Sequence, residues 1–197
     1  LWTLLLGNAW IVYRLSDSSL WVGVSTFASM SPYLVAPLGG MVADRAERRI
    51  LVRVTRLATF GVTITLATLA LIDVIEVWMV VSLAFVQGII RSVEIPSDQA
   101  LLANVVPVSD LGNAVALTST TQHGSRAAGP LLAGPLLATI GGEGAYGISA
   151  LFALLSFASV RRVNVSARGG VTRLRDVGQN MREGMAYIRR TPEVASI

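Results

Sequence analysis

The stretch that decides the fold is Gly40-Met41-Val42-Ala43-Asp44-Arg45-Ala46-Glu47-Arg48-Arg49. It joins two apolar runs, from about Leu20 to Val42 and from about Ile50 to Ile72. Each run has about 23 residues, which at ~1.5 Å per residue is enough to cross a hydrocarbon core of ~30 Å with some tilt. Because basic loops resist translocation, this turn is predicted to lie on the cytoplasmic side of a membrane.

The composition is that of a membrane protein. Of the 197 residues, 53% are hydrophobic and 14% are charged, whereas soluble domains carry about 25% charged residues. All 16 basic side chains are arginines, and they gather at the ends of the apolar runs. A membrane topology requires that placement, so nucleic-acid binding is the weaker interpretation. With no cysteine and one histidine, thiolate and multi-histidine metal centres are excluded, and no motif indicates a cofactor or an enzyme.

Six apolar segments are predicted to be membrane helices, at about residues 1–14, 20–43, 50–72, 77–106, 111–140 and 145–160. We expect the first to be truncated, because the chain opens inside an apolar run that lacks the features of a signal peptide. Residues 1–162 would then form a membrane bundle and residues 163–197 a cytoplasmic linker. Within that linker, apolar residues at helical spacing between arginines predict an amphipathic helix on the inner membrane face, with a solvated linker as the alternative.

The distribution of charge between the turns supports this count. Turns that follow the second, fourth and sixth segments must share the side of the basic stretch at 44–49. The arginine-rich tail at 161–197 falls on that side, whereas the opposite turns carry Asp17, Asp73, Glu76 and Glu143. We therefore expect loop 44–49 and tail 161–197 to be cytoplasmic in a multi-pass membrane protein.

The spacing Gly-x-x-x-Asp-Arg-x-x-Arg-Arg resembles the signature loop of the major facilitator superfamily. The matching residues are Gly40, Asp44, Arg45, Arg48 and Arg49, and Glu47 stands where many members carry a second glycine. A merely basic cytoplasmic turn is the alternative interpretation. The resemblance implies an all-α membrane protein in which this chain is the six-helix amino-terminal half, partnered by a carboxyl-terminal half of the same protein to make twelve helices. It also implies that the loop latches an inner gate.

Charged residues inside the fourth segment are a second notable feature. Arg91, Glu94 and Asp98 stand at i, i+3 and i+7, which places them on one helix face. Charges in hydrocarbon are costly and are expected to face the bundle interior and to pair. One interpretation is an ion pair that only holds helices together. The other, which the resemblance favours, is a charge relay to Arg48, with either acid as its partner.

The fifth segment carries Gln122, His123 and Arg126 where lipid-facing residues would be expected. They are candidates for cavity or proton-coupling roles, although a lone histidine is more often structural. Further along, Gly129, Pro130 and Gly134 resemble the helix-five motif of antiporters in this superfamily, with Ala133 and Ser125 replacing two of its glycines. Ordinary packing of small residues is the alternative.

A narrower resemblance points to bacterial siderophore exporters (enterobactin-exporter-like) and macrolide-efflux-like proteins. It rests on the stretch 37–45, Arg91-x-x-x-x-Pro96, Val106-Pro107 and the stretch 187–192. The function it implies is proton-coupled export of a small organic molecule by alternating access. An importer of the same superfamily and a non-transporting membrane scaffold are the alternatives.

Overall fold

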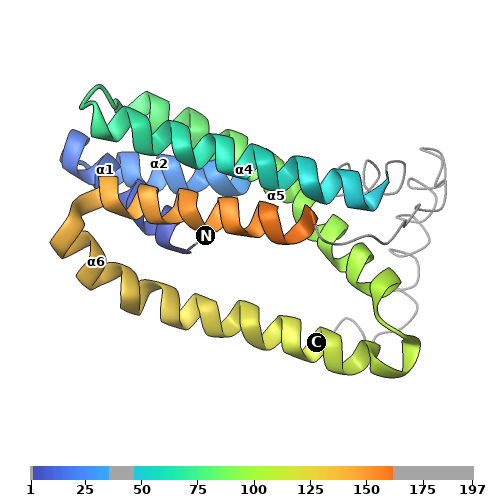
Figure 1. The fold of residues 1–197 in the computed structure, drawn as a ribbon. Coiled ribbons are helices and arrows are strands. Elements are labelled where there is room, and N and C mark those ends of the chain that lie inside the picture. The colour runs from blue at the N-terminus through green and yellow to red at the C-terminus, as the bar shows by residue number, and fades with distance from the viewer. Residues whose placement is uncertain (1, 36–46, 162–197) are drawn as a thin grey trace, which may run out of the picture.

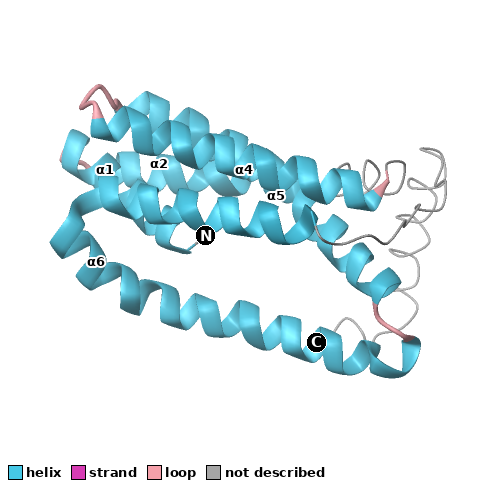
Figure 2. Ribbon diagram, viewed as in Figure 1, coloured by secondary structure: helices cyan, strands magenta, loops and turns pink. Residues whose placement is uncertain are grey.

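The computed structural model describes residues 2–35 and 47–161, and the regular elements in these ranges are all helices (Figure 2). They are α1 (Trp2–Ser16), α2 (Ser19–Met30), the 3-10 helix η1 (Ser31–Val35), α4 (Arg48–Leu71), α5 (Val77–Val105), the 3-10 helix η2 (Val108–Asp110) and α6 (Leu111–Arg161). Within residues 2–35 and 47–161, three helical stretches are long and apolar enough to cross a membrane: Arg49–Leu71, Val77–Val105 and Ala133–Val160. The prediction of an all-α membrane fold is confirmed.

The second predicted helix, at about residues 20–43, is described by the structure only as far as residue 35. α2 ends at Met30 and continues as η1, because Pro32 has no N–H to donate to the carbonyl of Ala28. The hydroxyl of Ser31 donates to that carbonyl instead, over 3.3 Å. The predicted remainder of this helix, with Pro37 and Gly40, lies outside the described residues. So do Asp44 and Arg45 of the loop, the predicted linker and its amphipathic helix.

The fifth and sixth predicted helices form one element, α6, which reverses direction at Gly141 (Figure 1). Gly141 has φ 67° and ψ −174°, a conformation that residues with a Cβ rarely adopt. Helical structure extends on both sides, over residues 111–140 and 142–161. One glycine therefore takes the place of the turn predicted at 141–144.

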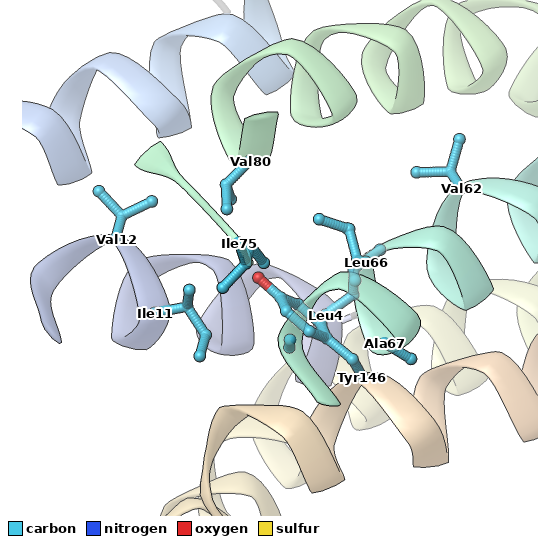
Figure 3. Close-up of a cluster of buried hydrophobic side chains, with 10 residues drawn as sticks. Leu4, Ile11, Val12, Val62, Leu66, Ala67, Ile75, Val80 and Tyr146 are labelled. Carbon is cyan, nitrogen blue, oxygen red and sulfur yellow. The ribbon is translucent and has the colours of Figure 1, made fainter. Parts of the chain in front are cut away.

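The hydrophobic core lies where α1, α4, α5 and the second segment of α6 meet (Figure 3). It consists of Leu4, Ile11, Val12, Val62, Leu66, Ala67, Ala70, Ile75, Val80 and Tyr146. Tyr146 is fully buried, and its hydroxyl donates a hydrogen bond of 2.9 Å to Oδ1 of Asn8 in α1. A buried hydroxyl without a partner would cost about 1–3 kcal/mol, so this bond fixes how α1 and α6 pack.

The first segment of α6 runs apart from this core (Figure 1). None of residues 111–131 is buried, in contrast to the second segment, which includes the buried residues Ala145, Tyr146 and Ala150. The first segment approaches α1 at Gly129, where an added Cβ would lie 2.6 Å from Cβ of Trp2. Around Gly134 there is open space, so within this motif only Gly129 is needed for close packing in the described part of the chain.

Candidate functional site

A charged cluster joins α4 to α5. The guanidinium of Arg56 donates through Nη1 to Glu94 and through Nη2 to Asp98, the latter over 2.5 Å. Glu94 and Asp98 are one helical turn apart on α5, so both carboxylates reach the same guanidinium. The side chains are 25% exposed for Arg56, 11% for Glu94 and 38% for Asp98. Arg56 and Glu94 are therefore mostly buried and Asp98 is partly exposed. The pairing offsets the cost of burying charge.

Arg56 was not among the predicted site residues, although the sequence contains a signal for it. α4 and α5 form an antiparallel hairpin around the short turn at 72–76, so residues equally far from that turn face each other. Arg56 and Glu94 are 38 residues apart and nearly symmetric about it. Gln87 and Thr59 share a hydrogen bond of 3.3 Å nearer the turn of the same hairpin.

The gate residues fall at the edge of what the structure describes. Arg48 begins α4 but its side chain lies outside the described part, and Arg49 is half-buried in the first turn. The proposed link from Glu94 or Asp98 to Arg48 therefore stays a prediction. In the contact that the structure does describe, Glu94 and Asp98 both pair with the same arginine, Arg56.

Arg91 is separate from the Arg56 cluster. Among the described residues it makes no ion pair within 4 Å, and its buried Nε has no hydrogen-bond partner there. It lines a cavity of about 400 Å³ between α1, α2 and α5. The other residues around that cavity are Trp2, Leu4, Leu5, Asn8, Ala9, Ser25, Thr26, Ser29, Met30, Tyr33, Ala84, Gln87 and Gly88.

Arg91 also lines a second cavity, of about 490 Å³, between α1, α5 and the first segment of α6. The remaining residues around it are Trp2, Thr3, Ile95, Gln122, His123, Ser125, Arg126, Ala128 and Gly129. The polar residues singled out in the fifth segment thus lie beside Arg91 at one cavity. The guanidinium of Arg126 lies 5.2 Å from the ring centre of Trp2, within the range of a cation–π contact.

The backbone of α2 and α5 comes unusually close beside the first cavity. A Cβ at Gly88 would clash with the carbonyl oxygen of Ser29 and lie 2.9 Å from Cγ of Pro32. Glycine at this position lets α5 pack against the point where α2 becomes η1, which fixes one wall of the cavity.

These features define a multi-pass α-helical membrane protein with buried charge and two cavities between its helices, both lined by Arg91. Over residues 1–197 the chain matches the family model described as transmembrane secretion effector. The chain belongs to this family of the major facilitator superfamily.

Curated relatives are members of the same superfamily. The staphyloferrin A transporter of Staphylococcus aureus is 28% identical over 70% of this chain and 35% of its own length. The uncharacterized MFS-type transporter YfiS of Bacillus subtilis is 24% identical over 91% of this chain and 43% of its own. The multidrug resistance protein MdtG of Dickeya zeae is 29% identical over 71% and 33%. The matched relatives are transport proteins rather than enzymes, and the chain spans about a third to two fifths of their length.

Proposed function

We propose that the protein containing this chain is a secondary active transporter that exports a small organic molecule, such as a drug or a siderophore, by proton-coupled alternating access. The observation that carries the proposal is the cavity between α1, α2 and α5 with Arg91 on its wall, in a chain of this family. Charged groups inside membrane helices are costly and usually mark substrate or ion routes. Substrate sites of secondary transporters lie between helices near the bilayer midplane.

The first segment of α6 supports the presence of a further half of the bundle. Residues 111–131 contain no buried residue in this chain, and the relatives are more than twice its length. We propose that the carboxyl-terminal half of the protein covers this segment and closes the other side of the cavities. Loop 44–49 and tail 161–197 would lie in the cytoplasm of a bacterial cell, with the bundle in its inner membrane.

In this scheme the loop at 44–49 latches the inner gate, and the Arg56 cluster holds α4 and α5 together beneath it. His123 is the candidate for proton coupling, because it lines the second cavity and an imidazole ring can accept and release a proton. The small-residue motif at 129–134 would let α6 rock against the opposite half.

The test is accumulation of dyes and siderophores in cells that express the full-length protein, with and without a protonophore. Proton-driven export predicts low accumulation that rises when the gradient is collapsed. Promotion of entry would instead favour an importer. Absence of any effect across a broad panel would favour a scaffold, in which the buried charges only hold helices together.

The substitution Asp44→Asn separates transport from folding. Transport should be lost in a transporter, while the amount of folded protein in the membrane stays near that of the unmodified protein. A scaffold would show no transport to lose. Arg14→Gln serves as the control. Arg14 lies in the last turn of α1 and pairs with Glu143 over 2.6 Å.

A further inference from the structure

The two cavities share Trp2 and Arg91 in their walls. Trp2 is at the start of α1 and Arg91 is in α5. These two side chains lie between the first cavity, which α2 also lines, and the second cavity, which α6 also lines. A ligand that spans both would pass Arg91.

The walls of the two cavities differ in character. The first is mainly apolar, with Leu5, Met30 and Tyr33 among its lining residues. The second carries two guanidiniums, from Arg91 and Arg126, together with the imidazole of His123. No carboxylate lines either cavity in the described part of the chain.

The nearest acids on α5 are already engaged. Glu94 and Asp98 both contact Arg56, and Asp98 is close enough to Arg91 to attract it electrostatically. The three guanidiniums of Arg56, Arg91 and Arg126 together outnumber these two carboxylates, so the region keeps a net positive charge even with His123 neutral.

The contact of Arg126 leaves its donors available. Cζ of Arg126 lies over the ring of Trp2, 5.2 Å from its centre, a contact that uses none of the guanidinium N–H groups as hydrogen-bond donors, and these groups match the fork of a carboxylate. In the described ranges Arg126 has no ion pair within 4 Å. The buried Nε of Arg91 likewise has no partner in these ranges, and an unsatisfied buried donor favours a ligand that accepts a hydrogen bond.

We propose that these paired cavities bind an organic anion that carries an apolar or aromatic body. The carboxylate or equivalent group would lie in the second cavity, facing Arg91 and Arg126, and the apolar body would occupy the first. The inference rests on the proposed function only in taking this site as the transport site. An organic cation would meet like charge here and is disfavoured.

A matched set of probes tests this directly. 1-Pyrenebutyrate, its neutral methyl ester and pyrenebutyl-trimethylammonium share one aromatic body and differ in charge. Binding to the full-length protein in lipid nanodiscs is followed by saturable quenching of tryptophan emission, corrected with empty nanodiscs. The expected result is that the anion binds at least about tenfold more tightly than the ester and the cation.

Variants at Arg91 and Arg126 test whether these two side chains carry the preference for the anion. Arg91→Gln and Arg126→Gln should each weaken binding of the anion by about ten- to a hundredfold, the effect of losing a charge-assisted hydrogen bond, and leave the ester unchanged. Arg91→Lys keeps the charge and should retain part of the selectivity. Arg14→Gln should bind all three probes like the unmodified protein. Thermal unfolding of each variant separates loss of the site from loss of the fold.

The outcomes distinguish the site from the transport function. Equal affinity for the three probes, no saturable binding of the anion, or an equal loss across the probes in the arginine variants overturns the inference. Selective binding of the anion without gradient-dependent export of any probe overturns the proposed function and leaves the site. Gradient-dependent export of the cation without preference for the anion overturns the site and leaves the function.

Discussion

Replacing Arg56 with methionine should destabilise the bundle strongly. The substitution keeps the length and apolar stem of the side chain and removes a guanidinium that contacts both Glu94 and Asp98. Two carboxylates would then face each other on α5 without their cation. Removing one partner of a buried ion pair costs about 3–5 kcal/mol, because the remaining charge stays desolvated.

The structure apportions that cost between the two acids. The Glu94 side chain is 11% exposed and that of Asp98 is 38% exposed, so Glu94 is less able to recover hydration. Glu94→Gln in the Arg56→Met background should therefore restore more stability than Asp98→Asn in the same background. Replacing all three side chains by apolar residues of similar size should bring stability back to within about 1–2 kcal/mol of the starting protein, since no unpaired charge is left.

The assay is equilibrium unfolding of the full-length protein in lipid or mild detergent, with the single, double and triple variants arranged as a mutant cycle. Arg14→Met is the matched control. Arg14 pairs with Glu143, but its side chain is 45% exposed, and pairs of that kind contribute about 0–1 kcal/mol. A cost below about 1 kcal/mol for Arg56→Met, or a triple variant no more stable than the single one, would refute the reasoning that Arg56 neutralises these two acids.

Three further predictions concern packing and the gate. Gly88→Val should lower the free energy of unfolding by about 1–3 kcal/mol or more, because α2 leaves no space for a side chain there. In the same unfolding assay Gly61→Ala should be neutral or slightly stabilising, because a Cβ there meets nothing within 4 Å. Tyr146→Phe should cost about 1–2 kcal/mol by removing the donor to Asn8, and adding Asn8→Leu should recover part of it; additive losses would contradict a direct bond. Asp44→Asn should abolish dye efflux with the folded amount unchanged, and normal efflux would exclude Asp44 from the gate.

Much of the fold follows from local sequence. Apolar runs of spanning length, bounded by polar turns, require helices in a membrane because lipid offers no partner for an exposed backbone. The turns at Asp17 and Asp73 lie where the sequence places them, and both residues adopt positive φ, 47° and 55°, which aspartate tolerates better than most side chains. The superfamily, too, was predicted from the spacing of one loop.

The site shows where such reasoning stops. Periodicity placed Arg91, Glu94 and Asp98 on one face of α5, but it carries no information about which other helix that face meets. The contacts with Arg56 and the position of Arg91 away from that cluster depend on helices from distant parts of the chain. Hairpin symmetry would have indicated Arg56, whereas the approach of residues 122–126 to Trp2 depends on how α6 leaves the bundle.

By itself, then, the sequence determined the membrane environment, the all-α fold and the superfamily, because hydropathy, charge and loop spacing act over neighbouring residues. Only the tertiary structure decided which charges pair, which arginine stays at the cavities and where a single glycine reverses α6. Those outcomes depend on the register and close approach of segments separated by tens of residues, and a period of 3.6 residues cannot encode them.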